Sequence, residues 1–199
     1  MKLLAFTDFH ASVVALKSVC EKIRKHKPDL VLCCGDMTVF EQNIGGVMAR
    51  LGALPVKVLV IHGNHEEDTT VAAHARKYPN VVFMHKRLYQ EGDVLFVGYG
   101  GHGFVRRDRG FERFVAREKK KLSLAKKIVL MTHQPPYGTK LDILHDAYVG
   151  NESFSEWIKK TSALVLAVSG HIHETFGKKD VLGSAVLLNP GPDGMIVTC

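Results

Sequence analysis

Short, largely apolar runs alternate with segments of helical periodicity through the first part of the chain. The apolar runs predict strands at residues 3–6, 30–34 and 56–61. Apolar side chains at helical spacing, and the segments between the strands, predict helices at residues 11–26, 41–51 and 68–77. Strands that are apolar on both faces and are separated by helices indicate a parallel sheet that is covered on both sides.

The remainder of the chain has shorter β-like runs, several of them too close together for a helix to lie between them. These runs occupy residues 81–83, 87–90, 94–97, 128–131, 164–168, 175–178 and 181–188. Further helices are expected at residues 106–121 and 154–160. No repeat and no linker rich in Pro, Gly or Ser divides the sequence. We therefore predict a single α/β domain that spans residues 1–199 and contains two sheets.

The composition is that of a globular protein, since 46% of the 199 residues are hydrophobic. The formal net charge of +7 favours anionic partners. The cysteines (Cys20, Cys33, Cys34 and Cys199) form no legible disulfide framework, which favours a reducing compartment. The first apolar run is too short for a signal peptide, and no run reaches the length of a membrane span. A cytoplasmic protein without a membrane partner is expected.

Side chains of the kinds that bind metals follow the predicted strands, one after another. They are Asp8, His10, Asp36, Asn64, His65, His133, His171 and His173. Carboxylate oxygen, amide oxygen and imidazole nitrogen suit borderline-to-hard transition metals. Each of these short motifs alone could be a helix cap or a turn. Their shared position at strand ends, where an α/β sheet opens its crevice, indicates one common metal site instead.

The spacing of these side chains along the sequence suggests how metals could be held. Asp8 and His10 flank Phe9 and would lie on one face of an extended strand end, and His173 would share a face with His171 in the same way. Asp36 follows Gly35, where the backbone can approach closely. A carboxylate at this point could bridge two cations roughly 3.5–4 Å apart, as in two-metal hydrolases.

This ordered set of motifs resembles the calcineurin-like metallophosphoesterases over residues 8–173. The resemblance implies a four-layer αββα sandwich with two mixed β-sheets flanked by helices. It implies one metal at Asp8, His10, Asp36 and His173, and a second at Asp36, Asn64, His133 and His171. It also implies that His65 is the catalytic histidine beside the leaving group, with Asn64 holding the phosphoryl oxygens. Mn²⁺ is the first expectation for both metals, and Fe, Zn, Ni or Co is compatible with these ligands.

Two departures refine the resemblance. Ala11 stands where the family often has glycine, and Met37-Thr38-Val39-Phe40 follow Asp36 without the acid and arginine of protein Ser/Thr phosphatases. The runs from His133 and from Gly170 look more like the small phosphodiesterase branch. The expected activity is hydrolysis of small phosphodiesters, with monoesters as a second class of substrate, through a dinuclear centre and a metal-bridging hydroxide.

Two other readings stay open. One is a DNA or RNA nuclease, suggested by the fold's use in DNA repair and by the basic residues between Arg106 and Lys127. Those residues are most simply a solvated helix face, but could also contact a phosphate backbone. The other is a non-catalytic scaffold such as the small retromer subunit, against which the complete ligand set argues. A homodimer through a short edge strand is also compatible with the sequence.

Residues 98–103 match the dinucleotide template G-x-G-x-x-G. The template requires a helix to begin at the glycine turn and an acid to end the next strand. Glu118 is at about the right distance, but it lies within the basic helix. We therefore expect no nucleotide cofactor here, and instead a rim of the active site with His102 nearby.

Overall fold

The computed structural model describes residues 1–101 and 103–199, and their strands form two large sheets and one small hairpin. The first sheet has the strand order β13-β1-β2-β3-β4. Its strands are β1 (Lys2–Phe6), β2 (Leu30–Cys34), β3 (Val58–Ile61), β4 (Val81–Phe83) and β13 (Met195–Thr198). β1 to β4 pair in parallel, and β13 pairs with β1 in the antiparallel sense. The predicted parallel sheet is confirmed.

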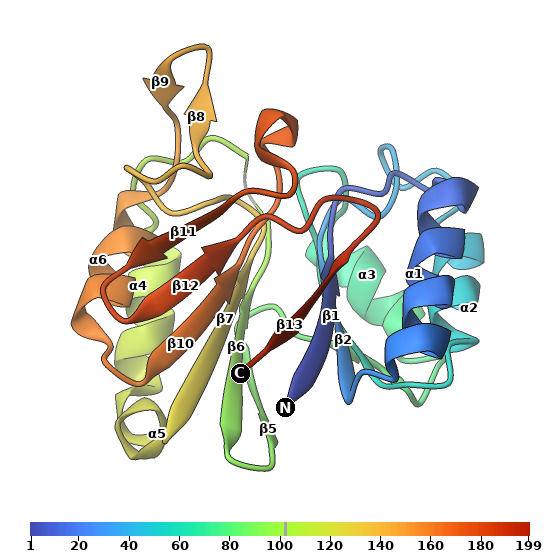
Figure 1. Cartoon of the computed structure of the whole chain (residues 1–199), viewed down its shortest axis with the longest axis horizontal. Coiled ribbons are helices and arrows are strands. Elements are labelled where there is room, and N and C mark those ends of the chain that lie inside the picture. Colours follow the sequence, from blue (N-terminus) through green and yellow to red (C-terminus); the bar gives the residue numbers. More distant parts are fainter. Residues whose placement is uncertain (102) are drawn as a thin grey trace.

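The second sheet has the strand order β11-β12-β10-β7-β6-β5. Its strands are β5 (Arg87–Glu91), β6 (Val94–Tyr99), β7 (Lys127–Thr132), β10 (Leu164–Val168), β11 (Lys179–Leu182) and β12 (Ala185–Leu188). The four central strands are parallel, and each edge strand is antiparallel to its neighbour. The small hairpin consists of β8 (Ile143–Leu144) and β9 (Ala147–Tyr148), and it projects from the top of the molecule in Figure 1.

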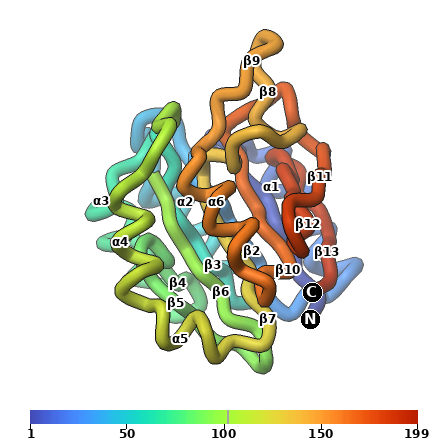
Figure 2. Tube along the Cα trace, turned by 90° about the vertical axis from the view of Figure 1, so that its left-hand side faces the viewer, coloured from blue at the N-terminus to red at the C-terminus, as the bar shows by residue number. Residues whose placement is uncertain are grey.

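Helices cover the outer faces of the two stacked sheets (Figure 1). The first sheet is covered by α1 (Val13–His26), α2 (Ile44–Gly52) and α3 (Asp68–Ala75). The second is covered by α4 (Arg109–Arg117), α5 (Lys119–Leu124) and α6 (Glu152–Lys160), which lie toward the viewer in Figure 2. One apolar core lies beneath each helical layer and a third lies between the sheets, where residues such as Leu32, Leu59, Phe96 and Val129 are fully buried. This is the expected four-layer arrangement.

Several predicted elements differ from the structure in detail. The helix expected at residues 106–121 is divided at Glu118 into α4 and α5. The strand expected at residues 175–178 is wrong, because this segment follows a 3₁₀ helix, η1 (His173–Thr175), and leads into β11. The run at residues 181–188 contains two strands, β11 and β12, because the chain reverses at Gly183, which has a φ of +62°.

In the described part of the glycine-rich run, residues 98–101 and 103, no helix begins, although a dinucleotide-binding turn requires one. β6 ends at Tyr99, and the next helix begins only at Arg109, after Asp108 accepts a hydrogen bond from the backbone of Phe111 as its N-cap. His102, expected at the rim of the site, lies outside the described residues. Among the described helices, none combines the length and apolar character that crossing a bilayer requires.

Candidate metal centre

The predicted ligand residues meet at the carboxyl ends of strands from both sheets. Among the described residues, three groups of Asp and His side chains bring their ligand atoms within 4.8 Å of one another. The groups are Asp8, His10 and His173; His10, Asp36 and His65; and Asp36, His133 and His171. His10 and Asp36 each belong to two groups, so the groups form one continuous cluster. The structure thus brings together all the histidines and carboxylates of the predicted metal-binding set, from Asp8 to His173.

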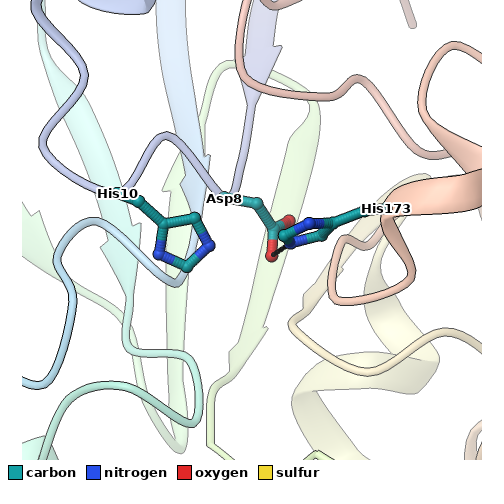
Figure 3. Close-up of side chains that lie close together, drawn as sticks. All are labelled: Asp8, His10 and His173. Carbon is teal, nitrogen blue, oxygen red and sulfur yellow. Dashed lines mark ion pairs between the residues drawn. The ribbon is translucent and has the colours of Figure 1, made fainter.

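Asp8 is the buried carboxylate of the first group. Its Oδ1 lies 3.5 Å from Nε2 of His173, the contact drawn in Figure 3, and its Oδ2 accepts hydrogen bonds from the Thr7 hydroxyl and the His171 backbone amide. Burial raises the pKa of Asp8, but these contacts and the charge of His133 outweigh it and leave the pKa lowered. Asp8 is therefore an anion that is ready to bind a cation.

His10 faces Asp8 from the other side in Figure 3. Its Nδ1 lies 2.9 Å from the carbonyl oxygen of Thr38 and can donate a hydrogen bond to it. This bond orients the ring and favours the tautomer that keeps a lone pair on Nε2, which is the arrangement typical of metal-ligating histidines. His10 thus has the geometry of a ligand, although it sits on a loop rather than on a strand.

Asp36 lies at the centre of the cluster and is buried. Its Oδ2 is 3.4 Å from Nε2 of His133 and 3.8 Å from Nε2 of His65, and its Oδ1 accepts a hydrogen bond from the His65 backbone. Burial raises the pKa of Asp36, but His133 and His65 outweigh it and bring the pKa to about 2. Asp36 thus shares one group with His10 and another with His133 and His171, a position from which a carboxylate could bridge two cations.

His133 is fully buried and connects the two sheets. Its Nδ1 lies 2.9 Å from the carbonyl oxygen of Cys34, and its Nε2 lies 3.0 Å from Oδ1 of Asn64. Burial lowers the pKa of His133, but Asp36 outweighs it and raises the pKa to about 9, so the ring holds a proton on each nitrogen. Nε2 of His133, which lies between Asp36 and Asn64, is the atom that would bind a metal ion.

His171 differs from His133 because it is held in the neutral form. Burial, together with the charge of His133, lowers the pKa of His171 to about 4. Its Nε2 is buried and has no hydrogen-bond partner among the residues that the structure describes. A buried polar atom without a partner is costly, and a bound metal ion would satisfy this one. The donor set therefore fits divalent metals, because Nε2 of His171 is a buried acceptor that a cation would satisfy.

The backbone around the ligands has an unusual conformation. Asp8, His10, Asp36 and His171 all have φ values in the left-handed region, from +44° to +70°. Asp and His adopt this region more readily than most residues, and backbone strain of this kind concentrates at functional sites. The prediction that Asp8 and His10 alternate along an extended strand is wrong, because β1 ends at Phe6. His173 likewise reaches Asp8 from a 3₁₀ helix rather than from an extended segment.

Glycine residues let the ligand loops approach one another. A Cβ atom at Gly35 would lie 2.7 Å from the backbone of Gly63 and from the ring of His133, and Gly35 itself has a φ of +93°. A side chain at Gly170 would collide with the Asp8 carboxylate. The glycines that precede Asp36 and His171 in the sequence are therefore required by packing at the site.

Glu66 directly follows His65, and its role could not be inferred from the sequence. Its Oε1 accepts hydrogen bonds from the backbone amide and hydroxyl of Thr38, and its Oε2 accepts one from the amide of Gly63. Glu66 is buried, so it joins the loop that carries Asp36 to the loop that carries Asn64. Only its place directly after Asn64 and His65 could have signalled this function.

The basic segment from Arg106 to Lys127 is only partly near the cluster. α5 leads into the amino end of β7, whereas the ligands lie at the carboxyl ends of the strands. Arg107 pairs with Glu156 at 2.8 Å, with further acidic partners on α4 and α6. These exposed ion pairs agree with the simpler interpretation of a solvated helix face.

Comparison with known proteins places this geometry in a family. The family model for calcineurin-like phosphoesterases matches residues 1–175. The uncharacterized protein MJ1162 of Methanocaldococcus jannaschii is 27% identical over 209 residues, covering 99% of this chain and 91% of the relative.

Solved structures share the fold at low sequence identity. The crystal structure of TT1561 of Thermus thermophilus superposes with a TM-score of 0.77 at 14% identity, covering 96% of this chain and 88% of the other. A dimetal phosphatase from Danio rerio superposes with a TM-score of 0.68 at 11% identity, covering 94% and 86%. With the match of the family model over most of its length, the chain belongs to the calcineurin-like phosphoesterases, a family of metal-dependent phosphohydrolases.

Proposed function

We propose that this protein is a phosphodiesterase that uses two divalent metal ions. The observation that carries the proposal is the position of Asp36, which shares one ligand group with His10 and another with His133 and His171. The first ion would be held by Asp8, His10, Asp36 and His173. The second would be held by Asp36, Asn64, His133 and His171. The likeness in fold to a protein described as a dimetal phosphatase supports two ions rather than one.

Mn²⁺ is our first proposal for both ions, and Fe, Zn, Ni or Co is compatible with this mixed set of oxygen and imidazole ligands. Bound ions of this kind neutralise phosphoryl oxygens and make hydroxide available near neutral pH. The protein's own groups then position the ester. Oδ1 of Asn64 faces His133, which leaves the amide nitrogen of Asn64 to donate to a phosphoryl oxygen.

His65 is the proposed general acid. Its backbone amide is fixed to Asp36, and its ring is half-buried at the edge of the cluster beside the ring of His10, with a centroid separation of 5.0 Å. From this position Nε2 can give a proton to the alkoxide as it leaves phosphorus. General-acid assistance of this kind contributes roughly 10²–10⁴-fold to a rate.

The charges around the cluster favour a diester over a monoester. The loops that carry the proposed ligands, residues 7–12, 35–43, 62–67, 133–139 and 169–176, contain no Arg or Lys. A monoester dianion carries one more negative charge than a diester and would benefit from such a cation. A diester monoanion is matched by the metals alone, so it is the substrate that we propose.

The test compares two chromogenic esters with the metal-free protein and with the protein reconstituted by Mn²⁺. We expect the reconstituted protein to hydrolyse bis(p-nitrophenyl) phosphate faster than p-nitrophenyl phosphate, and the Asp36→Asn variant to hydrolyse neither. A variant at a distant exposed carboxylate, Asp193→Asn, serves as the matched control. Faster hydrolysis of the monoester would contradict the diester preference, and a lack of turnover with every metal would contradict the enzyme assignment.

A further inference from the structure

Two phenyl rings lie against histidines of the cluster and are nevertheless exposed to solvent. Phe40 is 71% exposed and its ring centroid is 4.4 Å from that of His65. Phe104 is 63% exposed and its ring centroid is 4.5 Å from that of His171. Large exposed apolar side chains are uninformative when scattered, but a pair at the edge of a polar site indicates a binding surface.

The two rings lie at opposite ends of a series of contacts through Asp36. Phe40 contacts His65, whose Nε2 is 3.8 Å from Oδ2 of Asp36. The same oxygen is 3.4 Å from His133, and the His133 ring is 5.1 Å from that of His171, against which Phe104 packs. A phosphoryl group bound to the metals that Asp36 would hold therefore has a phenyl ring near each end of this series, one for each ester arm.

The backbone of Phe40 shows that its exposed ring is held in place. Its φ is +47°, a conformation that bulky residues rarely adopt because the Cβ atom crowds the backbone. The following residue, Glu41, is also left-handed, and its amide donates to the Thr38 hydroxyl that is bound to Glu66. The loop thus retains a strained conformation that presents an apolar ring to water, which favours a functional role for the ring.

Phe104 is positioned by the residue that precedes it. A Cβ atom at Gly103 would lie 2.9 Å from Cε1 of His171 and 3.7 Å from the side chain of Asn64, so the backbone of Gly103 lies directly on the proposed second metal site. Val105 follows Phe104, and its backbone amide donates to Oε1 of Gln134, the residue after His133. This segment therefore places the Phe104 ring beside the same ligands.

We propose that Phe40 and Phe104 bind flat, uncharged rings on the ester groups of the substrate, with Phe40 holding the leaving group against His65. This inference rests on the proposed function, because it names the substrate class of the same site. Phosphodiesters with aromatic or other flat ring-bearing arms are the preferred substrates. Diesters of small alkyl alcohols leave both phenyl rings in water and bind less tightly.

The inference can be tested by binding, without turnover. The probes are methyl(phenyl)phosphinate and dimethylphosphinate, two monoanions that have no ester bond to hydrolyse and that differ in one ring. Their dissociation constants for the Mn²⁺-loaded protein are measured by isothermal titration calorimetry. Stacking of one ring on an aromatic side chain predicts that the phenyl probe binds about tenfold more tightly.

The variants distinguish the effect of an aromatic ring from the effect of apolar surface area alone. We expect Phe40→Ala and Phe104→Ala each to reduce the phenyl preference and the double variant to abolish it, while Phe40→Leu keeps only part of it. Leu124→Ala removes an equally exposed apolar side chain on α5 and should leave the preference unchanged. Circular dichroism confirms that each variant is folded.

Three results would overturn the inference. They are equal binding, or no binding, of the two probes by the wild-type protein; a phenyl preference that survives in the double variant; and a Phe40→Ala variant that loses self-association with the preference intact, which would assign the ring to a contact between copies. Hydrolysis of bis(p-nitrophenyl) phosphate is measured on the same samples. Turnover without a phenyl preference refutes only this inference, whereas a phenyl preference without turnover refutes only the proposed function.

Discussion

Thr38 and Glu66, 28 positions apart, are joined twice: the amide and the hydroxyl of Thr38 donate to Oε1 of Glu66 at 2.8 and 2.9 Å. Glu66→Ala would leave these donors and the amide of Gly63 without their buried acceptor. Since hydrogen bonds to a charged group are worth about 1.5–3 kcal/mol each, we expect the free energy of unfolding to fall by about 3 kcal/mol or more.

The same substitution should also weaken metal binding, because Glu66 positions the loops of Asp36 and Asn64 without touching a metal. Loss of such a supporting residue typically costs 10–100-fold in metal affinity. Urea unfolding and metal titration measure the two effects, with the exposed neighbour Glu67→Ala as control. Unchanged metal affinity in Glu66→Ala would show that the loops hold their geometry without this carboxylate.

Asp36→Asn should reduce the bound metal more than any other single ligand substitution. Asp36 is the carboxylate that is shared between two of the ligand groups, and the neutral amide removes the negative charge between the proposed ions. Metal content after dialysis, measured by inductively coupled plasma mass spectrometry, is expected to fall well below that of Asp8→Asn. If the two variants retain equal amounts of metal, Asp36 does not bridge.

His65→Ala should separate metal binding from catalysis. We expect the variant to retain its metals, while kcat falls by roughly 10²–10⁴-fold for diesters of alkyl alcohols. The loss should be much smaller for p-nitrophenyl esters, because p-nitrophenolate leaves without a proton. His26→Ala, a histidine on α1 remote from the cluster, is the control. Equal losses for both classes of leaving group would rule out the general-acid role.

Removal of the metals should lower the thermal stability of the wild-type protein. A ligand at 100 times its Kd stabilises the folded state by about 2.7 kcal/mol. For a chain of this length, 1 kcal/mol corresponds to roughly 2–4 °C in Tm, so chelation should lower Tm by about 5–11 °C. Differential scanning calorimetry with and without Mn²⁺ measures this shift, which should be absent in Asp36→Asn.

Charge reversal on α5 should leave hydrolysis of a small diester unchanged. Lys119→Glu and Lys120→Glu alter a helix at the amino end of β7, away from the ligand-bearing ends of the strands. Digestion of single-stranded and duplex DNA is measured in parallel. If DNA is cleaved and the variants lose this activity with a weaker salt dependence, the basic segment contacts a phosphate backbone and the nuclease alternative gains support.

Much of this fold could be predicted because its central strands are uniformly apolar. β2 and residues 128–131 of β7 are continuous hydrophobic runs, and a predicted ligand, Asp36 or His133, follows the carboxyl end of each strand. The direction of the strands and the positions of the predicted ligands can therefore both be predicted from the sequence. The short β8–β9 hairpin lacks such a run, and its strands contain only two residues each, so its pattern is too brief to detect.

The geometry of the site was harder to predict than its composition. The left-handed backbone at Asp8 and His10 is stabilised by tertiary hydrogen bonds, such as that from the His10 amide to the carbonyl oxygen of Asp36. Local sequence does not encode such contacts. The exposure of Phe40 could not be predicted either, because the sequence around an isolated loop phenylalanine does not indicate which way its ring faces.

The hydrogen bond between His133 and the carbonyl oxygen of Cys34 joins segments that lie 99 positions apart. During synthesis, Asp8, Asp36 and Asn64 leave the ribosome long before the histidines that complete their coordination. The proposed site is complete only after residue 173 has been synthesised and the two sheets have packed together. Metal binding is therefore expected to be coupled to the folding of both sheets.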